Sequence, residues 1–147
     1  MGLYKHILLA ADFTEYGDEV ANKVKELAET NQAQLSIVHV IDNLPITDAV
    51  YGPIIPFDGD LTMQLMDAAK KRLSKIADKL GIDKNNQFLE IGSPKFEIVR
   101  VAEENNVDLI VVGSHGRHGL ALLLGSTANG VLHHASCDVL AVRMPND

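Results

Sequence analysis

The sequence predicts an α/β protein: a doubly wound, five-stranded parallel sheet with helices on both faces. Five short segments rich in apolar and β-branched residues alternate with segments whose apolar residues recur at helical spacing. The 147 residues fit a single domain over residues 1–147 that can bury a sizeable core. A composition that is 46% hydrophobic and 22% charged is that of an ordinary globular chain.

Charge and cysteine content narrow the classes of function. Twenty acidic and 13 basic side chains give a formal net charge of −7, which disfavours binding to nucleic acid or to an anionic membrane. The single cysteine, Cys137, cannot form an intrachain disulfide. No apolar export segment precedes the first strand, so we expect a cytoplasmic protein.

The first half of the chain begins with two strands separated by a helix. The segment His6–Ala11 is almost continuously apolar, as in a central parallel strand that helices cover on both faces. Thr14 is placed to cap a helix that runs to about Thr30. A second β-branched strand spans Leu35–Ile41, and a long connection with three prolines follows over residues 43–59.

A long amphipathic helix and a third strand follow. The helix is predicted over Asp60–Leu80, and Gly81 ends it. The strand, Gln87–Ile91, alternates polar and apolar residues, which favours a position nearer the edge of the sheet. The apolar stripe of the helix is expected to be buried and consists of Leu61, Leu65, Ala69, Leu73, Ile76 and Leu80.

The next unit has clear helix-start signals. Ser93 is placed to cap a helix and Pro94 takes its first position, where the missing N–H has no cost. Asn105 and Asn106 stop this helix. The apolar run Val107–Gly113 then predicts a second buried, central strand.

A last helix begins at Ser126 or Thr127 and runs through His134, before a fifth strand over Asp138–Arg143. Because the first and fourth strands are the most apolar, we place them side by side at the centre, which requires the order 3-2-1-4-5. Ligands of such sheets bind where the chain reverses direction across the sheet. Here that point lies between the strand ends at residues 10–13 and 112–115.

The segment from Gly113 to Thr127 is the strongest candidate site. Gly113 and Gly116 leave the fourth strand and Gly125 precedes a helix, so backbone without side-chain bulk converges where helical N–H groups are free to bind an anion. The hydroxyls of Ser126 and Thr127 add to this phosphate cradle. The other interpretation is that the glycines merely shape a tight connection. Three side chains could add positive charge: His115, Arg117 and His118.

Motifs of nucleotide-hydrolysing and dinucleotide-binding proteins are missing. No lysine follows Gly125, so this is not a P-loop of the Walker type. The first strand is followed by Asp12-Phe13-Thr14-Glu15 in place of a Gly-x-Gly-x-x-Gly turn. We therefore expect binding without fast hydrolysis and no enzyme activity, with a slow ATPase or nucleotidyl-transfer enzyme as a minor alternative.

Four blocks of the sequence carry a resemblance: Ile7–Thr14, Val38–Ile41, Val107–Gly116 and Cys137–Arg143. They resemble the universal stress protein family, occur in the order in which that family has them, and make a match that spans essentially the whole chain. The resemblance implies an adenine nucleotide alpha hydrolase-like sheet and a homodimer built through the last strand, Asp138 to Arg143. Without a partner, that strand would be a short edge blunted by Arg143 and Pro145.

Members of that family that bind nucleotides carry a Gly-x2-Gly-x9-Gly-Ser/Thr motif, an aspartate after the first strand and a valine of the second strand beside adenine. Carried over, the aspartate is Asp12 and the valine is Val40. This chain has only eight residues between Gly116 and Gly125, where the motif has nine. The predicted nucleotide-binding residues are Ala10, Ala11, Asp12, Val40, Val112, Gly113, Gly116, Arg117, Gly125, Ser126 and Thr127.

Two functions follow from these observations. The first is a universal stress protein that binds ATP, with magnesium, as a non-catalytic switch, where Asp12 contacts a ribose hydroxyl or a magnesium-bound water. The alternative is a homodimeric interaction module that binds no nucleotide because its loop is one residue short; Asp12 is then a carboxylate held by a helix dipole. His39 is expected to be a hydrogen-bonded core histidine and Cys137 a structural thiol, while His133 and His134 point apart and make a poor metal pair.

Overall fold

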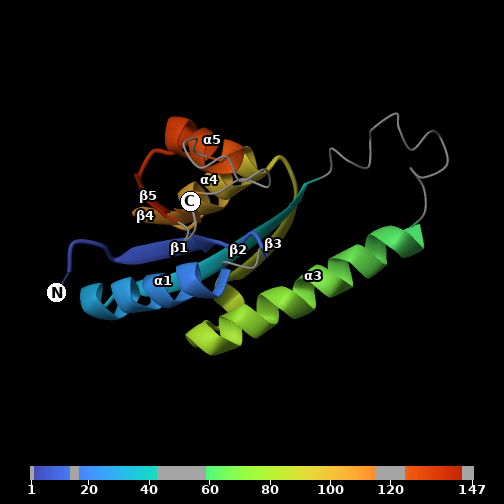
Figure 1. Ribbon diagram of the computed structural model, residues 1–147, viewed down its shortest axis with the longest axis horizontal. Helices are drawn as coiled ribbons and strands as arrows, with labels where there is room; N and C mark the ends of the chain where they lie inside the picture. Colours follow the sequence, from blue (N-terminus) through green and yellow to red (C-terminus); the bar gives the residue numbers. More distant parts are fainter. Residues whose placement is uncertain (1, 14–16, 43–58, 115–124, 144–147) are drawn as a thin grey trace.

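The computed structural model describes residues 2–13, 17–42, 59–114 and 125–143. These residues form an α/β sandwich with one sheet (Figure 1). The strands are β1 (His6–Ala10), β2 (Gln34–Asp42), β3 (Gln87–Gly92), β4 (Leu109–Gly113) and β5 (Asp138–Val142). The helices are α1 (Gly17–Asn31), α3 (Gly59–Leu80), the 3-10 turn η2 (Lys84–Asn86), α4 (Pro94–Glu104) and α5 (Ser126–His134).

The five strands are all parallel and lie in the order β3-β2-β1-β4-β5, which confirms the predicted sheet. Leu8 lies at its centre, in register with Ser36 of β2 on one side and Ile110 of β4 on the other. Ser36 is fully buried, and its hydroxyl is 2.7 Å from Nε2 of His6. Burial of both central strands explains why their sequences lack the alternation that the edge strand β3 shows.

Helices cover both faces of the sheet, with α1 and α3 on one side and α4 and α5 on the other (Figure 1). Alternate strand residues therefore enter two separate cores. Ile7, Leu9 and Ile37 pack toward α1 and α3. The residues one position along each strand pack toward α4 and α5: Leu8, Val38, Val40, Ile110 and Val112.

The predicted apolar stripe of α3 is buried along only part of the helix. Ala69, Leu73 and Ala77 are buried against the sheet, but Leu65 is 46% exposed and Met63 is 64% exposed. The N-terminal end of α3 extends beyond the sheet, so its apolar residues have no strand beneath them (Figure 1). The prediction that Leu65 is buried is therefore wrong. The side chain of Leu61 is not among those that the structure describes. The long connection over residues 43–58 also lies outside the described residues.

Three helices end in the same backbone motif. At the end of α3 the Gly81 N–H donates to Asp78 and the Ile82 N–H to Ala77, with Gly81 at a φ of 69°. This is a Schellman arrangement, which needs a left-handed residue just after the helix. Asn106 fills that position after α4, with a φ of 56°, and Gln32 fills it after α1, with a φ of 53°.

Gly81→Ala should lower the free energy of unfolding by ~1 kcal/mol, because a β-carbon disfavours the left-handed conformation. Apart from Gly81 itself and its two chain neighbours, no heavy atom lies within 4 Å of the added carbon, so backbone strain alone is responsible. Gln32→Gly should have the opposite sign and raise stability by a few tenths of a kcal/mol, since it relieves strain at a cost in chain entropy. Urea unfolding of both variants measures the two changes in the free energy of unfolding. If both variants gained stability or both lost it, the prediction would be contradicted.

Capping of α4 differs in detail from the prediction. Ser93 occupies the cap position and Pro94 begins the helix, as expected, but the Ser93 side chain makes no capping hydrogen bond. Its backbone carbonyl accepts from the N–H groups of Phe96 and Glu97 instead. Within the described ranges, no helix is long and apolar enough to cross a membrane.

Candidate functional site

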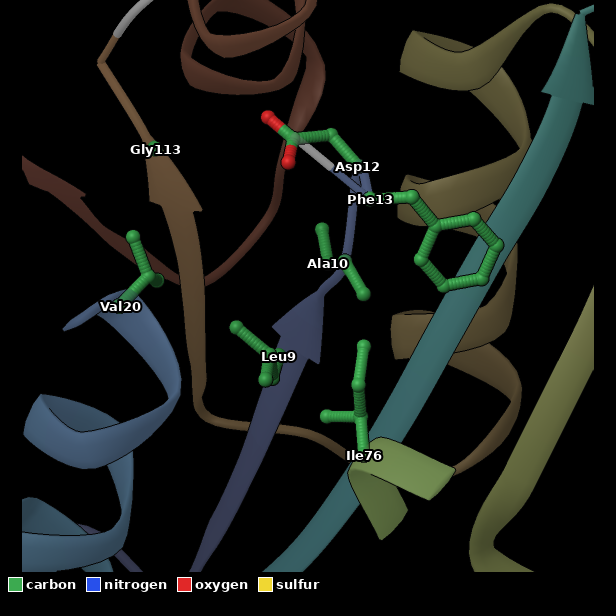
Figure 2. A pocket seen from close by; sticks show the side chains of 8 residues that line it. Leu9, Ala10, Asp12, Phe13, Val20, Ile76 and Gly113 are labelled. Carbon is green, nitrogen blue, oxygen red and sulfur yellow. The ribbon is translucent and has the colours of Figure 1, made fainter. Parts of the chain in front are cut away.

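The candidate site lies at the carboxyl ends of β1 and β4, the two neighbouring strands from which the chain continues toward opposite edges of the sheet. This is the topological switch point that the sequence predicts. A recess opens there on the side of α1 and α3 (Figure 2). Its lining consists of Leu9, Ala10, Ala11, Asp12, Phe13, Val20, Ile76 and Gly113.

Asp12 lies in the turn that leaves β1. Before it, the Ala11 N–H donates to the Val38 carbonyl over 2.9 Å and extends the pairing of β1 with β2 by one residue. Figure 2 shows the Asp12 carboxylate and the Phe13 ring on opposite sides of this turn. Asp12 is exposed, whereas Phe13 is half-buried. The turn therefore presents a carboxylate to solvent while it holds an aromatic ring against the protein.

The N-terminus of α5 supplies the second half of the site. The Gly125 N–H donates to the Ser114 carbonyl over 2.8 Å, and the Ser114 N–H donates to Val142 over 2.9 Å. Gly125 is the cap residue and has no side chain to satisfy the first N–H groups of the helix. Ser126 is exposed and Thr127 half-buried. The first turn of α5 is therefore a helix end with the partial positive charge that suits an anion.

Close packing against α4 holds the body of α5. Gly130 is buried, and a β-carbon built on it would lie 2.7 Å from Cβ of Lys95. Only glycine permits such an approach. Together with the bond between Gly125 and Ser114, this contact positions the start of α5 through tertiary packing.

The predicted site residues that the structure describes fall into three groups. Ala10, Ala11, Asp12 and Gly113 line the recess. The side chains of Val40 and Val112 are buried on the other face of the sheet, against α4 and α5, with 9% and 2% exposure. Gly125, Ser126 and Thr127 lie at the start of α5. The predicted contacts Gly116 and Arg117, and the nearby His115 and His118, lie outside the described residues.

Sequence reasoning did not assign Val20, Ile76 or Arg72 to the site. Val20 and Ile76 look like ordinary core positions of amphipathic helices, and no local signal separates them from other core residues. Arg72 lies one helical turn before Ile76, and its side chain donates to the Phe13 carbonyl over 2.8 Å. A cation on a predicted helix gives no indication that it reaches a loop 59 residues away.

His39 lies beneath the Asp12 turn. Its Nδ1 donates to the Ala11 carbonyl over 2.6 Å, and its ring stacks on Phe13 with centroids 3.8 Å apart. The predicted hydrogen-bonded histidine is thus confirmed. Burial lowers the pKa of His39 below its ordinary value, although the bond to Ala11 and the charge of Asp12 act in the opposite direction.

This lowered pKa predicts a dependence of stability on pH. The unfolded chain takes up a proton at His39 near its ordinary pKa of 6.5, and the folded chain does so only at lower pH. Protons therefore bind the unfolded state preferentially in that window, so the free energy of unfolding should fall as the pH drops below 6.5 and level off once the folded histidine is protonated.

His39→Gln keeps a donor for the Ala11 carbonyl but does not titrate. In urea unfolding at several pH values from neutral to acidic, this variant should lose less stability on acidification than the unchanged protein. Equal losses would mean that the pKa of His39 is the same in the folded and unfolded states.

Cys137, His133 and His134 are the other reactive side chains that the sequence analysis singled out and that the structure describes. Cys137 is half-buried, and burial raises the pKa of its thiol, which keeps the thiol protonated and makes it a weak nucleophile. His133 and His134 are exposed at the end of α5. Across the described part of the chain, no group of three or more His, Cys, Asp and Glu side chains could hold a metal ion.

Comparisons with known proteins show the family of this chain. Residues 3–143 match the universal stress protein family. Universal stress protein A homolog 2 of Coxiella burnetii is 45% identical over 145 residues, which are 98% of each chain.

Solved structures share the fold. The structure of hypothetical protein MJ0577 covers 99% of both chains with a TM-score of 0.82 and 30% identity. A universal stress protein in complex with cAMP covers 95% of this chain and 96% of its own, with a TM-score of 0.63 and 22% identity. At 22% identity, the similarity to the cAMP complex shows the fold alone. From the family match and the near full-length relative, we conclude that this chain belongs to the universal stress protein family.

Proposed function

We propose that this universal stress protein binds an adenine nucleotide, ATP with magnesium, at the β1/β4 switch point and acts in the cytoplasm as a non-catalytic switch. The observation that carries the proposal is the hydrogen bond from Gly125 to Ser114, which anchors the α5 N-terminus next to Gly113, a residue that lines the recess together with Asp12. A carboxylate, a helix N-terminus without a side-chain cap, and backbone without side-chain bulk at Gly113 and Gly125 then lie near the carboxyl ends of β1 and β4. Phosphates and a nucleoside need these groups.

The described residues fit the parts of the nucleotide as follows. Backbone N–H groups and the hydroxyls of Ser126 and Thr127 would hold phosphate oxygens at the start of α5. Asp12 would accept from a ribose hydroxyl or from a water of the magnesium ion. Val40 would lie beside adenine through its backbone, because its side chain is buried on the other face of the sheet. Magnesium usually takes most of its ligands from phosphates and water, so one carboxylate suffices.

Contacts outside the short interior of the glycine segment support the proposed cradle. That eight-residue interior, Arg117–Leu124, is one residue shorter than the family motif. Two contacts between described residues hold the edges of the proposed cradle: the Gly125 N–H donates to the Ser114 carbonyl, and Gly130 packs α5 against Lys95 of α4. This supports nucleotide binding over the alternative in which the shorter segment abolishes it.

We propose a switch, in place of an enzyme, from the groups that the described residues supply at the site. Fast phosphoryl transfer needs cations on the terminal phosphates and a residue that orients the attacking group. At the recess the described residues offer one carboxylate among mostly apolar side chains. We therefore propose that bound nucleotide persists and alters the surface that partners contact.

Adenine nucleotide released on denaturation of protein purified without added ligand, together with calorimetric titration with ATP and magnesium, tests the proposal. We expect saturable binding of one nucleotide per chain. A parallel titration with cAMP asks whether the terminal phosphates are needed. Neither released nucleotide nor heat of binding at millimolar ATP would overturn nucleotide binding.

A homodimer built through β5 is the second part of the proposal. β5 is an edge strand, and Leu140 on it is 36% exposed, as is typical of a surface that another chain covers. The observed strand ends at Val142, one residue before the predicted Arg143. Leu140→Lys should convert a dimer to a monomer in sedimentation. A dimer that binds no nucleotide would favour the interaction module instead.

A further inference from the structure

The turn after β1 has an unusual backbone. Phe13 has a φ of 61°, a left-handed conformation that a residue with a β-carbon rarely adopts. Among the described residues, two others besides glycine share it, Gln32 and Asn106, and both end helices. Phe13 ends no helix, and it lies directly beside Asp12. Such strain persists where the surrounding structure holds it, and it often occurs at functional sites.

Two side chains from other elements hold this turn. Arg72 of α3 donates to the Phe13 carbonyl over 2.8 Å, and its guanidinium carbon lies 4.7 Å from the centre of the Phe13 ring. His39 of β2 stacks on the same ring and donates to the Ala11 carbonyl. A hydrogen bond, a cation–π contact and a ring stack therefore act on one residue.

These contacts tie the chain on both sides of Asp12. The carbonyl before it accepts from His39 and the carbonyl after it accepts from Arg72. With both flanking carbonyls held and Phe13 turned toward His39, the Asp12 side chain leaves the turn on the opposite side (Figure 2). We infer that Arg72 and His39 are positioning residues, which hold Phe13 in its left-handed conformation and thereby direct the Asp12 carboxylate into the nucleotide site. This inference rests on the proposed function.

A direct role for Arg72 in phosphate binding is the competing explanation. One nitrogen of its guanidinium is used by Phe13, and the group has further donors. The two roles differ in how Arg72 depends on Asp12. A positioning residue loses its effect when Asp12 can no longer contact the ligand, whereas a direct ligand keeps it.

A double-mutant cycle distinguishes these roles. Arg72→Gln, Asp12→Asn and the double variant are titrated with ATP and magnesium. We expect each single variant to bind ~10-fold more weakly, the size of one lost hydrogen bond to a charged group, and the double variant to bind no more weakly than Asp12→Asn. Lys71→Gln is the matched control, because it removes the neighbouring exposed cation of α3 and should leave affinity unchanged. The inference would be overturned if the loss of affinity in the double variant were the product of the two single losses. Unchanged affinity in Arg72→Gln would overturn it as well.

Hydrogen exchange without nucleotide separates this inference from the proposed function. Amides of residues 11–13 should exchange faster in Arg72→Gln than in the unchanged protein or in Lys71→Gln. Phe13→Gly should accelerate them as well, because glycine adopts a positive φ freely but lacks the ring that His39 and Arg72 contact. Unchanged exchange in Arg72→Gln overturns the inference whether or not nucleotide binds. Absent binding by the unchanged protein overturns the proposed function, and the exchange result still decides whether Arg72 holds the turn.

Discussion

Ser126→Asp should weaken binding of ATP with magnesium at least ~10-fold, while the protein becomes no less stable. A carboxylate at the first position of α5 would face the phosphates, and two like charges ~6 Å apart repel by roughly 3 kcal/mol at an effective dielectric constant of 20. Screening by salt reduces this value, so ~10-fold is a lower estimate. The same charge interacts favourably with the helix dipole, which contributes about 0.3–1 kcal/mol to folding.

Opposite effects on affinity and stability make this prediction specific. Ser126 is exposed, so the substitution needs no rearrangement of the core. Ser126→Asn has nearly the size of aspartate without its charge and should retain most of the affinity. Calorimetric titration and urea unfolding of both variants give the comparison. If Ser126→Asp bound ATP as well as Ser126→Asn does, the phosphates would not lie at the start of α5.

Ile110→Ala should lower the free energy of unfolding by about 2–5 kcal/mol, which is a large part of the stability of a small domain. Ile110 is fully buried in β4, in register with Leu8 of β1 and Val139 of β5. Truncation removes three methyl or methylene groups and leaves a cavity between the sheet and the helices α4 and α5. Ile110→Val should cost only about 0.5–1.5 kcal/mol because the cavity is smaller.

The matched control lies on the edge of the same sheet. Ile91 of β3 is 42% exposed, so Ile91→Ala removes the same atoms with less loss of burial and should cost no more than about 1 kcal/mol. Urea unfolding of Ile110→Ala, Ile110→Val and Ile91→Ala ranks the three variants by their loss of free energy of unfolding. A cost at Ile91 equal to that at Ile110 would mean that the exposed end of β3 is covered in solution.

Local patterns carried most of the information about the fold. The unbroken apolar character of the segments around Leu8 and Ile110 placed both strands at the centre, and the alternating segment at Gln87–Ile91 placed the third strand at an edge. These predictions succeeded because burial on one or two faces leaves a direct record in the spacing of apolar residues. The prediction for Leu65 failed because helical spacing marks an apolar face without showing whether a sheet extends beneath it.

The candidate site was predictable only in part. Its location at the carboxyl ends of the first and fourth strands follows from strand order, and the glycines and hydroxyls of the Gly113–Thr127 segment are visible in the sequence. By itself, then, the sequence determined the family resemblance, the order of the strands in the sheet, and the strand ends at which a ligand would lie. It could do so because periodicity and spacing are properties of neighbouring residues.

Only the tertiary structure decided how the site is held. It brings His39 and Arg72 to the turn at Phe13, and it anchors Gly125 on Ser114. These contacts join residues from separate strands, helices and loops, and their geometry depends on how complete layers pack. No local pattern records such packing, so the direction of the Asp12 carboxylate and the position of the α5 N-terminus emerge only once the chain is folded.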